Sequence, residues 1–238
     1  AEKHLREAID SVLDQTYTNW EMIFWDNLST DGTRTIVKSH DDKRIRYLLS
    51  EQFTPLGEAR ELAMSKAQGK YLSFLDCDDL FLPEKLSIQV LLMERSNSGL
   101  CYGSALIIDE EGTTKREHLV PLREGIVFGD LLKRYEINMQ TVMIKKSIMN
   151  DSYCFFDKHL EYSPDFNLFM KIASIHPIVS TDKFLSKYRI APNSLSSKCK
   201  EIAGKEGRHT LDYIFHQNPE LLDEYKVEAD YAYKKMIY

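Results

Sequence analysis

Residues 69–79 read GKYLSFLDCDD, and this stretch decides the fold. Gly69 ends a segment with helical spacing, and residues 71–75 form a short apolar run. Three carboxylates follow within four positions, at Asp76, Asp78 and Asp79. A short apolar run between Gly and Asp is typical of a buried strand. We therefore predict that these carboxylates lie at the carboxyl end of a strand, the edge of an α/β sheet where ligands gather.

The alternation of helix and strand extends upstream. Apolar residues at helical spacing predict helices over residues 1–15 and 57–67, and apolar runs predict strands over residues 20–25 and 45–49. The order αβαβαβ favours an α/β fold with a mostly parallel central sheet flanked by helices. Because such a sheet normally opens with a strand, we expect a hydrophobic strand upstream of Ala1 that this sequence lacks.

Downstream of Pro83 the pattern is looser. The sequence from residue 200 to 238 is helical in spacing, with a break at Asn218 and Pro219. Other elements are predicted between these regions: strands over residues 100–108, 139–144 and 184–190, and helices over residues 128–134 and 165–173.

Composition excludes several classes of protein. The chain has 238 residues, of which 43% are hydrophobic, so it can bury one sizeable core. Its 37 acidic and 31 basic residues leave a net charge of -6, which argues against a nucleic-acid partner. The four cysteines form no C-x-x-C pair and are expected to be reduced thiols. No apolar run approaches the roughly 20 residues of a spanning helix, and we expect a cytoplasmic protein.

The acidic cluster at residues 76–79 is a candidate metal site. Carboxylates this close repel one another unless a cation lies between them. Mg²⁺ and Mn²⁺ take oxygen ligands and leave coordination positions for substrate phosphates, so a strand-end Asp-x-Asp suits a metal that bridges a diphosphate. The alternative is a solvated acidic turn that caps the helix beginning near Pro83.

A second polar cluster, residues 26–33 (DNLSTDGT), also follows a predicted strand. Asp26 is placed to accept hydrogen bonds from a base or ribose, and Ser29 or Asp31 to cap the next helix. The alternative is an ordinary capped loop. Calcium-loop spacing would require an oxygen ligand where Leu28 stands.

Together these segments resemble the family 2 glycosyltransferases of the GT-A fold. The resemblance is dense over residues 5–95 and thinner to about residue 195. The matching segments, in family order and spacing, are residues 8–17 (AIDSVLDQTY), 26–33, 57–60 (GEAR) and 69–79.

The resemblance implies a Rossmann-like GT-A domain over residues 1–196, with a donor half at about 1–98 and an acceptor half at about 99–196. Residues 197–238 would then be a C-terminal helical extension. The implied activity is inverting transfer of a sugar from a nucleoside diphosphate sugar, with UDP expected, to a glycan or lipid-linked acceptor. Synthesis of cell-surface polysaccharide is the expected setting, with peripheral association at the inner membrane face.

The resemblance also implies roles for individual residues. Asp165, within the matching segment 156–171, would be the base that takes a proton from the acceptor hydroxyl. Its alternative role is to complement the dipole of the helix that it begins. The donor nucleotide would be bound by Asp26, Asn27, Asp31, Arg60 and Asp76, and Mn²⁺ or Mg²⁺ by Asp76, Asp78 and Asp79.

Two departures from the family pattern leave alternatives open. Ala191 stands where histidine is common, and Glu61 stands where asparagine is common. The first departure keeps open a catalytically inactive module that binds a sugar nucleotide. A sugar nucleotidyltransferase, which also uses strand-end aspartates and a metal, is the other alternative.

Overall fold

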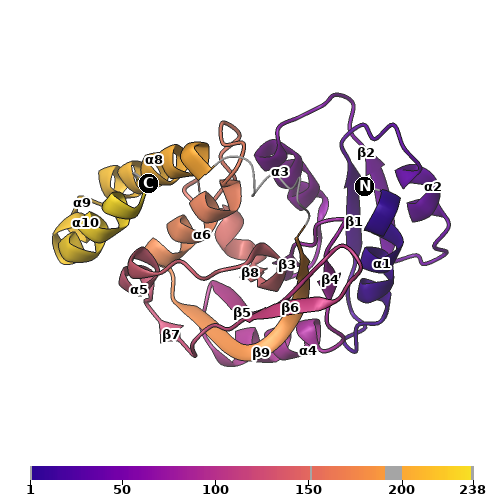
Figure 1. Cartoon of the computed structure of the whole chain (residues 1–238), viewed down its shortest axis with the longest axis horizontal. Coiled ribbons are helices and arrows are strands. Elements are labelled where there is room, and N and C mark those ends of the chain that lie inside the picture. The colour runs from indigo at the N-terminus through magenta and orange to yellow at the C-terminus, as the bar shows by residue number, and fades with distance from the viewer. Residues whose placement is uncertain (1, 151, 191–199, 237–238) are drawn as a thin grey trace.

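The computed structural model describes residues 2–150, 152–190 and 200–236 (Figure 1). Its first part confirms the predicted alternation of helices and strands, and β1 pairs with β2 in parallel. The elements are α1 (Glu2–Leu13), β1 (Met22–Asp26), α2 (Thr33–Lys38), β2 (Ile45–Leu49), α3 (Leu56–Lys66) and β3 (Tyr71–Ser73).

The second part of the chain supplies most of the larger sheet. Its elements are β4 (Leu80–Phe81), α4 (Lys85–Arg95), β5 (Leu100–Ile108), β6 (Thr114–His118), β7 (Glu124–Gly125), α5 (Phe128–Lys133), the 3-10 turn η1 (Met139–Thr141), β8 (Met143–Lys145), the 3-10 turn η2 (Lys146–Asn150), α6 (Pro164–Ile175) and β9 (Ile178–Arg189). The chain then forms the C-terminal helices α8 (Lys200–Gln217), α9 (Pro219–Glu224) and α10 (Lys226–Lys235).

The expectation of a mostly parallel sheet is wrong. Seven of the described strands form one mixed sheet with the main order β3-β8-β5-β9-β4, while β6 pairs with β5 and β7 with β9. Its described pairs are antiparallel except for β5 with β9. The physical reason lies in the connections, because β5 and β6 are joined by a short turn without the crossover that parallel neighbours need.

The strand predicted over residues 139–144 is only partly correct. Residues 139–141 form the turn η1, in which the Asn138 side chain accepts a hydrogen bond from the Gln140 amide, and β8 begins at Met143. Apolar residues on both sides of Gln140 gave the run its strand-like appearance. The turn instead directs the Gln140 side chain towards the acidic turn after β3.

The main core lies between the mixed sheet and the helices α5, α6, α8 and α10. Figure 1 shows α8, α9 and α10 at the opposite end of the molecule from α1, α2, β1 and β2. Helices are therefore confirmed after residue 200. Within the described residues, no helix combines the length and apolarity needed to cross a bilayer. Cys77 and Cys101 are free thiols, as predicted.

Candidate donor and metal site

The acidic turn joins β3 to β4 and holds Asp76, Asp78 and Asp79 in three different environments. The Asp76 side chain is 43% exposed and Asp78 is also exposed, whereas Asp79 is only 1% exposed. Partial desolvation of its carboxylate by neighbouring groups, together with the negative charge of Asp76, raises the pKa of Asp78. A cation bound by Asp76 and Asp78 would relieve this repulsion.

Asp79 has hydrogen-bond partners at both carboxylate oxygens. Oδ1 accepts from the backbone amide of Arg189 at 2.7 Å, and Oδ2 accepts from the side-chain amide of Gln140. Burial raises the pKa of Asp79 to about 8. Asp79 therefore joins the acidic turn to β9 and η1, and this environment does not suit a metal ligand.

The remaining residues fit a metal that is held partly by its substrate. No group of three or more His, Cys, Asp or Glu side chains within the described ranges is arranged to hold a metal ion. Mg²⁺ commonly binds through one or two carboxylates plus substrate phosphates and water. Asp76 and Asp78 meet that requirement, so the predicted metal ligands Asp76 and Asp78 stay in place as a proposal.

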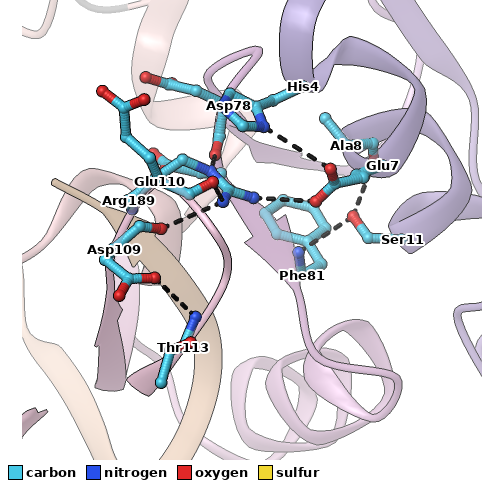
Figure 2. A network of polar contacts seen from close by, with 11 residues as sticks. His4, Glu7, Ala8, Ser11, Asp78, Phe81, Asp109, Glu110, Thr113 and Arg189 are labelled. Carbon is cyan, nitrogen blue, oxygen red and sulfur yellow. Dashed lines mark hydrogen bonds and ion pairs between the residues drawn. The ribbon is translucent and has the colours of Figure 1, made fainter. Parts of the chain in front are cut away.

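Arg189, at the end of β9, fixes the acidic turn to its neighbours (Figure 2). Its side chain is 2% exposed and donates hydrogen bonds to the backbone oxygens of Asp78 (2.8 Å), Asp109 (3.1 Å) and Glu110 (2.8 Å). It also pairs with the Glu7 carboxylate of α1 at 2.9 Å. One guanidinium thus connects α1, the acidic turn and the β5–β6 turn.

Arg60 and Asp165 come together with Asp76 from three separate elements. Arg60, on α3, pairs with an Asp76 oxygen at 3.1 Å. Asp165 lies in the first turn of α6. Burial raises the pKa of Asp165, and the charge of Arg60 offsets part of this rise. The sequence predicted roles for all three residues, and the structure places them in one neighbourhood.

Asp26 is the last residue of β1 and is 2% exposed. Its two oxygens accept hydrogen bonds from the Tyr47 hydroxyl at 2.5 Å and the Ser29 amide at 2.7 Å. Burial raises the pKa of Asp26, but these hydrogen bonds outweigh burial and leave the pKa below its ordinary value. The protein thus holds the Asp26 carboxylate ionised and oriented, and its contact with a nucleoside stays a prediction.

Asn27 and Asp31 make local contacts in the loop after β1. The Asn27 side chain donates to the Thr54 carbonyl oxygen at 2.8 Å and accepts from the Thr54 amide at 3.1 Å. Asp31 accepts a hydrogen bond from the Thr33 amide at 3.0 Å, at the start of α2. The N-cap residue of α2 is Gly32, so the prediction that Ser29 or Asp31 occupies the cap is wrong, although Asp31 does bind the first helical amide. The departure at Ala191 lies outside the described residues.

Gln140 and Arg189 belong to this site although the sequence assigned neither a role. Gln140 donates to Asp76 at 3.2 Å as well as to Asp79. Its contacts span more than 60 residues of sequence, so no local pattern reports them. Arg189 lies in the weakly matching segment near Ala191, and that match was the only available signal.

Comparison with known proteins now identifies the family. The model of Glycosyl transferase family 2 matches residues 1–161. The chain belongs to glycosyl transferase family 2. The match covers the acidic turn, Arg60 and Asp26, and it ends just before α6 with Asp165.

Relatives within family 2 differ in length. The chain is 33% identical over 205 residues to the Escherichia coli UDP-Glc:alpha-D-GlcNAc-diphosphoundecaprenol beta-1,3-glucosyltransferase WfgD, covering 85% of the chain and 78% of the relative. It is 28% identical over 208 residues to the putative teichuronic acid biosynthesis glycosyltransferase TuaG of Bacillus subtilis, covering 86% and 81%. An uncharacterized Rickettsia felis glycosyltransferase is 36% identical, but the chain spans only 30% of its length.

The fold also matches solved structures. Staphylococcus aureus TarS, crystallised as residues 1–349 in complex with UDP-GlcNAc, superimposes with a TM-score of 0.76 at 18% identity. The match covers 99% of this chain and 68% of that one. This family 2 chain therefore has the α/β GT-A fold, with a mixed sheet and C-terminal helices.

Proposed function

We propose that this protein is an inverting glycosyltransferase that moves a sugar from a UDP-sugar to a glycan or lipid-linked acceptor. The observation that carries the proposal is the convergence of Asp76, Arg60 and Asp165 from the acidic turn, α3 and α6. Such an arrangement suits a transferase, because carboxylates able to hold a metal would lie near a half-buried carboxylate able to serve as the acceptor's base. The E. coli relative, named as a UDP-Glc transferase, supports the choice of UDP.

The donor would lie along the strand ends from Asp26 to Asp78. Asp26 binds the base or ribose, and Asp76 and Asp78 hold Mg²⁺ or Mn²⁺ at the donor diphosphate. When bound, the ion supplies positive charge that offsets the charge developing on the leaving diphosphate. Arg60, adjacent to Asp76, adds a permanent positive charge on the same side. Asn27 and Asp31 contribute by holding the loop around Asp26 in shape.

Asp165 would act as the base in a single displacement. The acceptor hydroxyl oxygen bonds to the anomeric carbon while the bond from that carbon to the diphosphate breaks, and Asp165 takes the hydroxyl proton. Its raised pKa makes the ionised Asp165 carboxylate a stronger base than that of an exposed aspartate. A single displacement with one base inverts the anomeric configuration.

The acceptor is proposed from the relatives. The name of the E. coli enzyme specifies a diphosphoundecaprenol-linked sugar, and that of the B. subtilis relative specifies teichuronic acid biosynthesis. We extend a lipid-linked acceptor and polysaccharide synthesis to this chain. Such an acceptor would place the protein at the cytoplasmic membrane face as a peripheral enzyme.

A thermal-shift titration tests the donor site. UDP, GDP and UDP-glucose are added with and without Mn²⁺ to the wild type, to Asp78→Ala and to Asp223→Ala, a control on the exposed surface of α9. We expect UDP compounds to raise the melting temperature, with the Mn²⁺-dependent part lost only in Asp78→Ala. Absence of any nucleotide-dependent shift in folded wild type would refute the proposal.

A further inference from the structure

A cavity of about 450 Å³ lies between α3 and the segment that precedes α6. Glu58 and Glu61 of α3 line one wall, and residues 155–159 line the other. The volume falls in the range of pockets that hold small ligands. None of the residues assigned to the donor or metal lines this pocket, so the proposed donor site does not account for it.

The pocket adjoins the reacting groups. Phe156 lines it, and the Phe156 ring centre lies 6.0 Å from the guanidinium of Arg60, which pairs with Asp76. Gly57, at the start of α3, packs so closely on the opposite wall that a Cβ atom there would lie 2.7 Å from the Asp157 carbonyl oxygen and 3.5 Å from Pro164. Pro164 directly precedes Asp165. The lining residue Asp157 and the residue before the proposed base thus both pack against Gly57, which places the pocket near the proposed base.

The lining combines aromatic rings with acidic groups. Phe155 and Phe156 supply apolar surface, while Glu58, Glu61 and Asp157 supply three carboxylates. Lys158 and His159 are the basic residues in the lining. Behind Phe155, the Lys171 ammonium lies 3.7 Å from the ring centre and donates to the Phe155 carbonyl oxygen at 2.8 Å.

Glu61 is fixed within this wall. One of its carboxylate oxygens accepts a hydrogen bond from the Phe156 amide at 3.2 Å. The side chain is therefore oriented by the opposite wall and faces the same space as Phe155. Glu61, which stands where asparagine is common in the family, therefore lines this pocket. The residue at this position can affect which ligand the pocket accepts.

We infer that this pocket binds an uncharged sugar ring of the acceptor, with Glu61 as a specificity-determining residue, and that it excludes the acceptor's phosphate groups. The inference rests on the proposed transferase function. A sugar ring has an apolar face that suits the phenylalanine rings and hydroxyl groups that donate to carboxylates. The three lining carboxylates outnumber the one lysine, so the lining carries an excess of negative charge that disfavours a phosphate.

A binding experiment with simple probes tests this chemistry. Saturation-transfer NMR is recorded with methyl glycosides of glucose, galactose and N-acetylglucosamine, and with N-acetylglucosamine 1-phosphate. The proteins are the wild type, Glu61→Gln, Phe155→Leu, and Glu220→Gln as a matched control on the exposed surface of α9. A variant is folded if UDP with Mn²⁺ raises its melting temperature as it does that of the wild type.

We expect at least one neutral glycoside to bind the wild type and the control in preference to the phosphate. Glu61→Gln should weaken neutral binding by up to about tenfold, because a hydrogen bond to a charged group is lost. The same change should also reduce the discrimination against the phosphate, a result that a merely structural role for Glu61 would not produce. Phe155→Leu should weaken neutral binding while leaving discrimination unchanged.

Three results would overturn the inference: no neutral glycoside binds, the phosphate binds the wild type equally well, or binding is unchanged in both pocket variants. Failure of the proposed transferase function gives a different result: nucleotides would then not raise the melting temperature of the wild type. Glycoside binding that responds to Glu61 without any nucleotide shift would retain the pocket as a sugar site and reject the transferase.

Discussion

Asp76, Asp78 and Asp79 are neighbours in sequence, yet the structure gives each a different environment. Asp76 pairs with Arg60 and Gln140, Asp78 is exposed, and Asp79 is buried with partners at both oxygens. The difference arises because the turn after β3 directs one side chain into the molecule and leaves the others at its surface. At the scale of single residues, the cluster divides into two accessible carboxylates, which we propose bind the ligand, and one buried carboxylate held by hydrogen bonds.

Substitution separates these two parts. Asp79→Asn leaves an amide that cannot accept at both positions, so we expect the free energy of unfolding to fall by about 1–3 kcal/mol. Asp78→Asn should change it by less than about 0.5 kcal/mol, since the side chain is exposed, but should remove the Mn²⁺-dependent stabilisation by UDP. Urea denaturation with and without UDP and Mn²⁺ measures both effects. The reverse pattern would mean that Asp79 is the ligand.

Asp165 has a testable pH dependence. Burial raises its pKa, and the ionised form is the one that accepts a proton. The transfer rate should therefore rise with pH through a pKa above the ordinary aspartate value of about 3.9. Asp165→Asn should lower kcat by about 10²-fold to 10⁴-fold. The variant should also lose the fall in transfer rate at low pH, while its binding of UDP stays unchanged. If the transfer rate of Asp165→Asn still falls at low pH in the same way, another residue is the base.

At the scale of elements, α4 is joined to the sheet through a buried lysine. Lys85 is 0% exposed, and its ammonium lies 2.6 Å from Gln89 Oε1, 3.2 Å from Ser73 Oγ and 3.2 Å from the Val142 carbonyl oxygen. These contacts connect α4 to β3 and to the residue before β8. Burial lowers the pKa of Lys85 to about 7.

Lys85→Met should therefore show a pH-dependent loss of stability. Between about pH 7 and the ordinary lysine pKa of about 10.4, the unfolded wild type binds a proton that the folded protein has released, so wild-type stability rises with pH. The variant lacks this gain, and its deficit should widen by up to about 1.4 kcal/mol per pH unit. Urea denaturation at pH 7, 8 and 9 tests this. A deficit independent of pH would show that Lys85 remains charged in the fold.

At the scale of the whole molecule, the C-terminal helices share the main core with the sheet. Leu211 and Ile214 of α8 are fully buried in it. Phe128 of α5 makes edge contacts with Phe215 and Tyr225, at ring-centre distances of 6.1 and 5.5 Å. The predicted domain division near residue 196 thus falls between segments that bury apolar surface together, which favours unfolding as one unit.

Phe215→Ala tests this coupling. Removal of a buried phenylalanine side chain should lower the free energy of unfolding by about 3–5 kcal/mol. Of the protein's two tryptophans, Trp25 belongs to β1 and Trp20 precedes that strand by two residues. Figure 1 shows β1 at the opposite end from the C-terminal helices, so tryptophan fluorescence reports on a distant part of the molecule. Fluorescence and circular dichroism should shift together in urea, whereas Val227→Ala, at a residue 76% exposed, should shift neither. Separate transitions would indicate an independent C-terminal unit.

The sequence alone predicted α1, β1, β2, α3 and β3 close to their observed bounds, together with the strand-end position of the acidic turn and the family. Periodicity and turn residues indicate which side of a segment is buried. This can be predicted from a few neighbouring residues, without knowledge of distant parts of the chain. The Asp26 loop and the start of α6 were predicted for the same reason. Their assigned roles in binding and catalysis remain predictions.

Only the tertiary structure decided how these pieces pair. The parallel pairing of β5 with β9, the contacts of Asp79 with Gln140 and Arg189, and the pocket beside Glu61 all join segments 60 or more residues apart. Local periodicity shows that a side chain is buried but not which distant group lies against it. That choice depends on the packing of the whole chain, and it separates a structural carboxylate from one free to bind a ligand.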